Sequence, residues 1–172
     1  VIVKTCDADG RVTGERRFAG LFTSAAYHAM ASDVPLLRGR VAGVLRRSGI
    51  DANGHDGKAL MAILDSYPRD ELFQIDEDTL YDQALGILQL QERRRVALFA
   101  RRDAVGRFAS NLVFVPRERF DAALNERFAA ILEQAWDGKV TTVVGEASSD
   151  SALAQALYSV KLRQPDAPTP DL

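Results

Sequence analysis

The sequence predicts an α+β fold that begins with a β-hairpin, continues with a layer of three helices and ends in a four-stranded unit of order ββαββ. Three observations support this class. Apolar residues alternate with polar ones near the start, recur with helical spacing in the first half, and form short, nearly continuous runs in the second. Glycine, proline and aspartate residues separate these segments and indicate turns between them.

The composition is that of a globular protein. The 172 residues are 47% hydrophobic and 27% charged, which suits one ordinary domain or two small ones. The net charge of -2 gives no indication of a nucleic-acid or membrane partner, and no apolar run approaches the roughly 18 residues of a membrane span. One cysteine, Cys6, excludes an internal disulfide and fits the reducing cytoplasm. Because the sequence starts at Val1 without a secretory signal, we expect an excised or processed segment of a cytoplasmic protein.

The first segment, residues 1–33, is predicted to contain the hairpin over residues 1–22. Asp7–Gly10 supplies the turn, because glycine accepts positive φ and aspartate bonds its own backbone. Phe18 and Leu21 are expected to anchor the second strand. Two aspartates in the turn resemble the start of a calcium loop, but the third oxygen ligand and the glycine at the sixth place are missing, so we expect no metal there.

The second segment, residues 34–91, is predicted to be the helical layer. Pro35 suits the first turn of the first helix, which Ser32 or Asp33 can cap, and Asp76 caps the third. Each helix carries an apolar stripe with the spacing of one buried face. The three expected helices start at Pro35, His55 and Asp76 and end near Ser48, Tyr67 and Gln91.

The third segment, residues 92–163, is predicted to be a sheet with one helix over residues 118–136. Residues 108–115 are almost all apolar, which indicates a central strand. The four strands are expected at Val96–Arg102, Phe108–Val115, Lys139–Val144 and Ala154–Leu162. With the helix before it, this order makes most of a ferredoxin-like or ACT-like βαββαβ unit, its first strand missing or borrowed from the hairpin, with helices on one face of the sheet. Residues 164–172 are rich in proline and are expected to form a linker or tail.

The start of the second helix carries one candidate site in the segment His55-Asp-Gly-Lys58. Free N–H groups at a helix start attract anions, so His55, Asp56 and Lys58 are candidates for binding a carboxylate or phosphate of an effector. The simpler interpretation is a helix cap, in which Asn53 or Asp56 accepts the first N–H groups and Gly57 allows close packing. The segment lacks the glycine-flanked pattern of a P-loop.

Charge is segregated along the chain. Residues 65–82 hold seven acids and one arginine, whereas residues 93–119 hold eight arginines and two acids. We expect the two regions to pair with each other or to face partner surfaces of opposite charge. Arg69, Arg94 and Arg102 are therefore candidate effector-binding or interface residues. RNA binding by the arginine-rich hairpin is a less favoured alternative.

Nothing in the sequence indicates a catalytic, cofactor or metal site. Ser24 and His28 are four residues apart and could in principle act as nucleophile and base, but no orienting residue and no Gly-x-Ser-x-Gly elbow accompanies them. No strand–GxGxxG–helix unit occurs, so we expect no nicotinamide site in these residues.

Several dense and unusual segments follow one another over residues 8–130. They are Phe18–Tyr27, Val34–Arg38, His55–Leu60, Tyr67–Gln74, Leu88–Arg95, Gly106–Phe108 and Val113–Arg117. In these segments and in their order, the chain resembles the N-terminal, non-catalytic region of the large bacterial NAD-specific glutamate dehydrogenases, which contains ACT-like and PAS-like modules.

The resemblance implies a parent that oxidatively deaminates L-glutamate to 2-oxoglutarate and ammonia with NAD. Its catalytic residues and nucleotide fold lie in a C-terminal part, so no catalytic role is transferred to this chain. The implied partners are other domains of the same polypeptide and further copies in a homo-oligomer. Two functions stay open: an architectural segment that builds the oligomer, and an ACT-type domain that binds an amino-acid effector. Pro116 and Arg117 stand where ACT-type sites often use glycine, which favours architecture.

Overall fold

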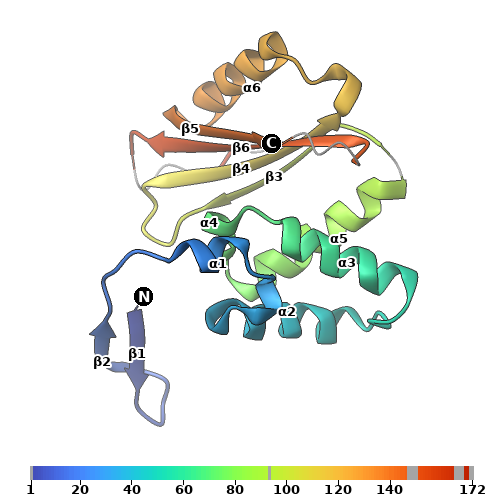
Figure 1. Ribbon diagram of the computed structural model, residues 1–172. Helices are drawn as coiled ribbons and strands as arrows, with labels where there is room; N and C mark the ends of the chain where they lie inside the picture. The colour runs from blue at the N-terminus through green and yellow to red at the C-terminus, as the bar shows by residue number, and fades with distance from the viewer. Residues whose placement is uncertain (1, 93, 147–150, 165–168, 171–172) are drawn as a thin grey trace. The chain divides into compact units, whose positions relative to one another are not determined.

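The structure, a computed structural model, describes residues 2–92, 94–146, 151–164 and 169–170. These residues form two compact units, Val1–Met30 and Ala31–Leu172. The predicted α+β class is confirmed, since a hairpin, a set of helices and a four-stranded sheet with a helix follow one another along the chain (Figure 1). Most of the predicted proline-rich tail lies outside the described residues.

The first unit contains the predicted hairpin. β1 (Ile2–Cys6) pairs antiparallel with β2 (Val12–Arg17). In the turn, Asp7 Oδ1 accepts a hydrogen bond from the backbone N–H of Asp9 at 3.0 Å. Gly10 has a φ of +80°, a conformation that costs glycine no steric strain. The aspartates therefore shape the turn, as predicted.

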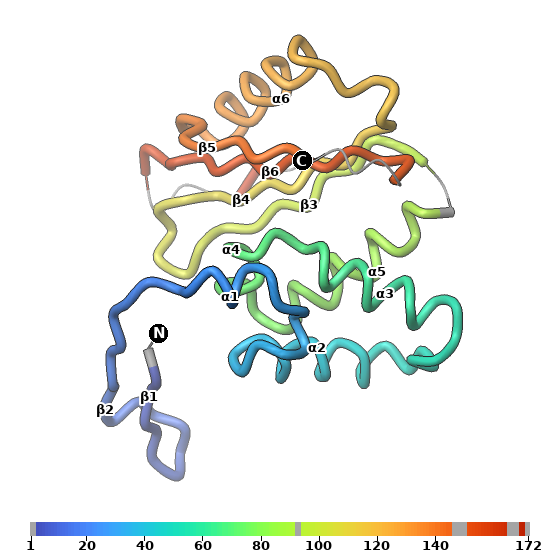
Figure 2. The backbone as a smooth tube through the Cα atoms, in the orientation of Figure 1, coloured from blue at the N-terminus to red at the C-terminus, as the bar shows by residue number. Residues whose placement is uncertain are grey.

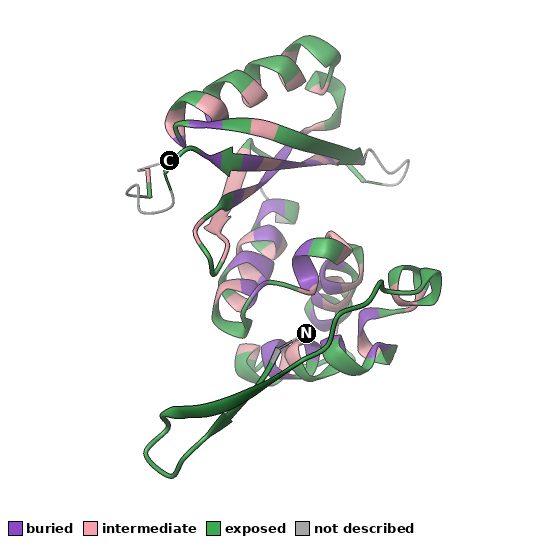
Figure 3. Cartoon of the chain, turned by 90° about the vertical axis from the view of Figure 1, so that its left-hand side faces the viewer, coloured by how far each residue is buried: buried purple, intermediate pink, exposed green. Residues whose placement is uncertain are grey.

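The prediction that Phe18 and Leu21 anchor the second strand of this hairpin is wrong. β2 ends before Phe18, which is 61% exposed, and Leu21 is 99% exposed. The hairpin is exposed along its described length (Figure 3), because two strands alone have no second layer to cover their side chains. The short helix α1 (Ser24–His28) follows in the same unit.

The second unit begins with the helical layer, whose three predicted helices are confirmed. A fourth, short helix was not predicted, because four residues are too few to show an apolar stripe. After the 3-10 turn η1 (Ala31–Asp33), the helices are α2 (Pro35–Ser48), α3 (His55–Ser66), α4 (Arg69–Leu72) and α5 (Glu77–Glu92). Their stripes form a core that includes the fully buried Leu37, Val44, Leu60, Leu64, Leu80 and Ala84.

Among the predicted N-terminal helix caps in this layer, the cap of α5 is confirmed and the cap of α2 is wrong. Asp76 Oδ1 accepts a hydrogen bond from Thr79 N at 2.8 Å, so the predicted cap of α5 is confirmed. This bond is the main reason that the pKa of Asp76 lies below its usual value. At α2 the N-cap is Val34, which makes no side-chain cap bond. The prediction that Ser32 or Asp33 caps this helix is wrong, since both belong to the preceding η1 turn.

The rest of the unit is an antiparallel sheet of order β3-β4-β6-β5. Its strands are β3 (Ala97–Arg102), β4 (Phe108–Pro116), β5 (Gly138–Glu146) and β6 (Leu153–Leu162). β4 lies inside the sheet, as its apolar sequence predicted. The backbone trace runs from the helices into β3 and β4, passes through α6 and returns in β5 and β6 (Figure 2).

The strand order explains the missing first strand. In a βαββαβ sheet the first strand lies between the third and the fourth and is antiparallel to both. Here β6 occupies that place, between β4 and β5. The N-terminal hairpin forms a separate two-stranded sheet, so the prediction that it lends the strand is wrong. The ACT-like sheet is completed by its own C-terminal strand.

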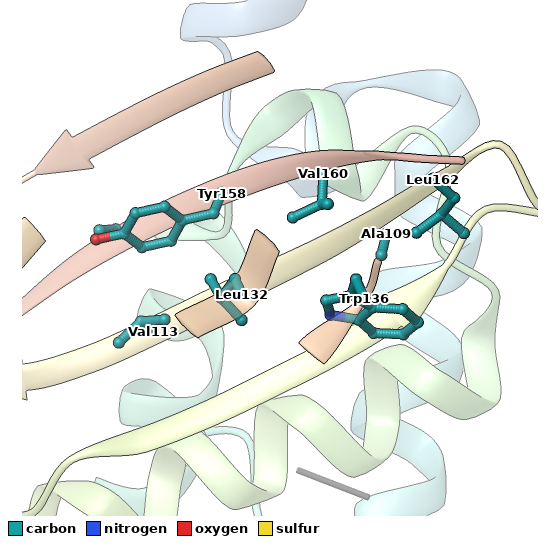
Figure 4. Close-up of a cluster of buried hydrophobic side chains, with 8 residues drawn as sticks. Ala109, Val113, Leu132, Trp136, Tyr158, Val160 and Leu162 are labelled. Atoms are coloured by element: carbon teal, nitrogen blue, oxygen red, sulfur yellow. The ribbon is translucent and has the colours of Figure 1, made fainter. Parts of the chain in front are cut away.

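Helix α6 (Ala122–Ala135) covers one face of the sheet. Its Leu132, with Trp136 just after it, packs on residues of β4 and β6 (Figure 4), namely Ala109, Val113, Ala156, Tyr158, Val160 and Leu162. The helix starts later than predicted, because Asp121 is its N-cap and accepts a hydrogen bond from Leu124 N at 2.7 Å. Ile131 of α6 is 56% exposed.

A buried amide organises the core under α6. Trp136 Nε1 donates to Asn111 Oδ1 at 2.8 Å. Asn111 Nδ2 in turn lies 3.3 Å from the carbonyl oxygen of Ala109 and 3.4 Å from that of Tyr158. Asn111 is fully buried, so these bonds satisfy polar groups that would otherwise lose their hydration without compensation.

The helical layer covers the opposite face (Figure 1), so the prediction of helices on one face only is wrong. Phe99 of β3 packs against Gly86 of α5, where an added Cβ would come within 2.6 Å of the ring. Gln155 Nε2 of β6 donates to the carbonyl oxygen of Ser66 at 3.4 Å. The sheet thus lies between α6 and the helical layer.

Candidate functional site

Charged and polar side chains join the helical layer to the sheet. We call Tyr67, Glu71, Gln83 and Arg101 the polar seam. Arg101 Nε of β3 donates to Glu71 Oε2 of α4 at 2.7 Å, and the two side chains are only 11% and 9% exposed. Such a pair holds its partners in one geometry, because either charge left alone in the interior would be costly. The acidic and basic regions of the sequence meet at this ion pair.

A second contact of the seam lies within the helical layer. The Tyr67 hydroxyl donates to Gln83 Oε1 of α5. Burial raises the pKa of Tyr67 above its usual value, and the negative charge of Glu71 adds to this effect while Arg101 opposes it. Tyr67 is therefore held as a protonated hydrogen-bond donor.

A polar pocket of about 370 Å³ adjoins the seam. Asp103, in the β3–β4 turn, accepts a hydrogen bond on Oδ1 from Phe108 N at 2.8 Å and so closes the turn. The other side chains are mainly hydroxyls and guanidinium groups from all four strands and the turn. The lining residues are Glu71, Gln74, Arg101, Asp103, Arg107, Phe108, Ala109, Ser110, Thr141, Thr142 and Ser159.

The predicted site at the start of α3 is only partly assembled. His55 and Asp56 line a pocket of about 260 Å³ with residues of α5, whereas Lys58 is exposed and does not line it. No side chain caps α3, so the predicted cap by Asn53 or Asp56 is wrong. The predicted close packing at Gly57 is present, since an added Cβ there would meet the Asp51 carbonyl oxygen at 2.1 Å.

The three predicted arginines lie at separate places. Arg69 opens α4, and Arg94 lines a pocket of about 200 Å³ beyond the end of α5. Arg102 lies on the α6 face of the sheet, with its guanidinium carbon 5.7 Å from the centre of the Trp136 ring. The structure therefore does not bring these arginines to the His55 region.

Sequence reasoning missed the residues that do converge. Glu71 and Arg101 were counted within charged regions and not singled out. One signal was present: alternation along the strand separates Arg101 from Arg102, so only one of them faces the helical layer. The hydroxyls of Ser110, Thr142 and Ser159 gave no signal, because their convergence depends on strand order.

Ser24 and His28 do approach one another, but not as nucleophile and base. His28 Nδ1 lies 3.2 Å from Ser24 Oγ and 2.8 Å from the Ser24 carbonyl oxygen. A carbonyl can only accept, so the shorter contact requires the proton to be on Nδ1. That nitrogen then cannot remove a proton from Ser24.

The described residues do not form a dinucleotide-binding fold of the Rossmann type. A dinucleotide site of the Rossmann type requires parallel strands joined by helices, whereas neighbouring strands in the described sheets are all antiparallel. Nicotinamide dinucleotide therefore does not fit this fold in that manner. In the same part of the chain, no group of three metal-binding side chains comes together, and no helix is long and apolar enough to cross a membrane.

Comparisons with known proteins agree with this organisation. The family described as "Glutamate dehydrogenase, helical motif 1" matches residues 34–93, and "Glutamate dehydrogenase, ACT2 domain" matches residues 97–172. The NAD-specific glutamate dehydrogenase of Halomonas elongata is 46% identical over 158 residues, which cover 90% of this chain and 10% of that protein. That of Pseudomonas aeruginosa is 39% identical over 165 residues, or 94% of this chain and 10% of that protein.

A third relative is similar over a shorter part of the chain. The NAD-specific glutamate dehydrogenase of Mycobacterium tuberculosis is 35% identical over 130 residues, covering 76% of this chain and 8% of that protein. The chain spans about a tenth of the length of the curated relatives it matches. Helical motif 1 corresponds to the helical layer and ACT2 to the sheet with α6. The chain therefore belongs to the large NAD-specific glutamate dehydrogenases, as an N-terminal region that contains helical motif 1 and the ACT2 domain.

Proposed function

We propose that this chain is a non-catalytic, architectural and regulatory segment of a large NAD-dependent glutamate dehydrogenase. The names of the relatives support a parent that converts L-glutamate to 2-oxoglutarate and ammonia with NAD as the hydride acceptor. Bond-making in this proposal belongs to another part of the polypeptide. The partners of the segment are the other domains of that polypeptide, and the single cysteine supports a cytoplasmic location.

The specific task that we propose is to hold helical motif 1 and the ACT2 domain together as one body. The Glu71–Arg101 ion pair carries this proposal, because its two residues come from the two family matches and are both shielded from water. We propose a corresponding division of the chain into a hairpin segment (1–33), a helical layer (34–91), an ACT-like unit (92–163) and a tail (164–172).

Amide hydrogen exchange of the whole chain tests this joint. In Arg101→Ala, exchange is expected to rise in α4 and in β3 together, because both lose the contact that couples them. The ion pair between the exposed Lys139 and Glu133 of α6 provides a control, and Lys139→Ala should change exchange only near β5 and the end of α6. A rise confined to β3 in Arg101→Ala contradicts the proposal.

We further propose that the outer edge of β5 joins copies of the enzyme. β5 ends the strand order, and Val143 and Val144, which face opposite sides of the sheet, are 40% and 50% exposed. An exposed edge offers unpaired backbone groups to another strand. The bulge between Val140 and Thr142 interrupts the first part of the strand, so the part after it is the better docking edge.

Light scattering coupled to size-exclusion chromatography tests this contact. The wild-type chain should show a concentration-dependent mass above 18.9 kDa, and Val144→Lys should shift it towards the monomer. Val105→Lys is the matched control, because Val105 is an exposed valine in the β3–β4 turn. A monomeric wild type at every concentration, or an equal effect of the two variants, contradicts a β5 contact.

A second function, amino-acid sensing, is supported by one observation. The pocket beside the seam contains both acidic and basic side chains, as a zwitterionic ligand requires. Binding regulates the parent only when the ligand prefers one of two conformations. Calorimetry of the chain with single amino acids tests this function. Saturable binding heat with one amino acid supports it, and the lack of binding heat with every amino acid contradicts it.

RNA binding is not proposed. Arg101 of the arginine-rich hairpin contacts Glu71 in the interior, and Arg102 lies over Trp136 on the α6 face. These two arginines are therefore not arranged along a surface that follows a phosphate backbone.

A further inference from the structure

Four polar residues from the four strands lie in one register across the sheet. Arg101 of β3 is opposite Ser110 of β4, Ser110 is opposite Ser159 of β6, and Ser159 is opposite Thr142 of β5. Directly opposite residues in an antiparallel sheet point to the same face. We call Arg101, Ser110, Ser159 and Thr142 the polar row.

The polar row faces the helical layer. Arg101 reaches Glu71 of α4, so its face is the one away from α6. The neighbouring row on the same face, two residues along each strand, is entirely apolar. It consists of Phe99, Leu112, Leu157 and Val144. The change from apolar to polar side chains therefore occurs across all four strands at once, which packing alone does not require.

The polar row forms the floor of the pocket of about 370 Å³ beside the seam. Glu71 and Gln74 border this pocket from the helical layer, and Asp103 and Arg107 border it from the β3–β4 turn. The pocket is thus bordered by residues of both family modules. Its volume lies in the range of small-molecule sites.

The donors of the row suit a carboxylate. A hydroxyl donates one hydrogen bond and a guanidinium up to five, of which the Arg101–Glu71 contact accounts for one. Glu71 fixes the guanidinium of Arg101 in place before any ligand arrives, and Arg107 adds a second positive charge at the rim. Carboxylates bind arginine through charge-assisted hydrogen bonds.

The acids of the pocket restrict the ligand further. Glu71 and Asp103 balance the two arginines, so a dianion such as phosphate gains little net attraction there. A ligand that carries an ammonium group beside its carboxylate matches both signs. We propose that the polar row and the residues around it bind an α-amino acid between the ACT2 sheet and helical motif 1. This inference rests on the amino-acid-sensing function proposed above and assigns its site.

Isothermal calorimetry of the whole chain, titrated with the common L-amino acids one at a time, tests the site. At least one amino acid should bind saturably. Ser159→Ala and Arg107→Ala should each weaken its binding roughly tenfold, the effect of about one lost hydrogen bond to a charged group. Ser66→Ala, outside this pocket, should bind like the wild type, and circular dichroism verifies that each variant is folded.

Titrations with further ligands distinguish a zwitterion site from a simple anion site. L-Glutamate and 2-oxoglutarate form one matched pair, since the second lacks the ammonium group, and inorganic phosphate tests a simple anion. Equal or tighter binding of the 2-oxo acid or of phosphate overturns the zwitterion assignment. An amino acid whose affinity is unchanged in Ser159→Ala and Arg107→Ala overturns the site but leaves the sensing function standing. If no amino acid gives binding heat, both the site and the sensing function are overturned. The architectural proposal is tested separately, by the mass of the chain in solution and by hydrogen exchange.

Discussion

Arg101 Nε donates a hydrogen bond to Glu71 Oε2 at 2.7 Å, and this contact links the sheet to the helical layer. The two residues are 30 positions apart in the sequence and belong to the two family matches. Because both side chains are almost completely shielded, each charge depends on the other for compensation. We therefore expect the pair to favour one arrangement of the two modules.

Removing one partner of this pair should destabilise the chain strongly. Glu71→Ala leaves the Arg101 guanidinium buried without its carboxylate, and the free energy of unfolding should fall by about 3–5 kcal/mol. Urea denaturation measures the change. Asp78→Ala is the control: it removes the exposed ion pair between Arg47 and Asp78 and should cost less than about 1 kcal/mol. Equal costs for the two variants would show that the buried pair has no special role.

Two glycines in helices should respond to alanine in opposite directions. At Gly57 of α3, an added Cβ would meet the Asp51 carbonyl oxygen at 2.1 Å and Ala52 Cα at 2.6 Å. Gly57→Ala should therefore destabilise the chain by about 1–3 kcal/mol, the usual cost of overpacking. At Gly39 of α2 nothing lies within 4 Å of the added atom, and Gly39→Ala should stabilise by about 0.5–1 kcal/mol. Thermal unfolding of both variants measures the sign of each change in stability. A Gly57→Ala variant as stable as the wild type would contradict the close packing of Asp51 and Ala52 on Gly57.

The buried amide of Asn111 should be important for the core under α6. Asn111→Ala leaves the Trp136 indole N–H without its acceptor and should cost about 1–3 kcal/mol beyond the lost packing. Trp136 is the only tryptophan in the sequence, so its fluorescence follows this region directly. In the Trp136→Phe background the same substitution should cost less, because no indole N–H is left unsatisfied. A cost that does not depend on Trp136 would argue against this hydrogen bond.

The buried Tyr67 should make stability fall at alkaline pH. Its pKa is raised in the folded chain, whereas the unfolded chain loses the proton near pH 10. Above that pH the folded state binds more protons than the unfolded state, so rising pH lowers the free energy of unfolding. Tyr67→Phe lacks this contribution, and the difference in stability between wild type and variant should narrow above about pH 10. Urea midpoints at several pH values measure it, and a constant difference would contradict the burial effect.

Local signals made much of the helical layer and the strands predictable. Asp76 caps α5 by accepting a hydrogen bond from Thr79, three residues away. A hydrogen bond over so short a range can be predicted from the local sequence. The apolar run of β4 likewise indicated its interior place in the sheet. Leu21 was misjudged because its apolar character does not show whether a second layer exists to cover it.

Features that depend on strand order were not predictable in this way. The place of β6 between β4 and β5 results from pairings with residues far away in the sequence. Ser110 and Ser159 are brought opposite each other by one of those pairings, and neither residue is unusual in its own segment. The register had to be known before the polar row became visible.

If helical motif 1 and the ACT2 domain form one structural body, they should unfold together. Equilibrium urea unfolding of the whole chain tests it most directly, with two probes recorded on the same samples. Trp136 fluorescence follows the core between α6 and the sheet, and far-UV circular dichroism follows mainly the helices. A single structural body should give one transition with the same midpoint for both probes. Helices that melt at a clearly different urea concentration from the Trp136 signal would contradict it.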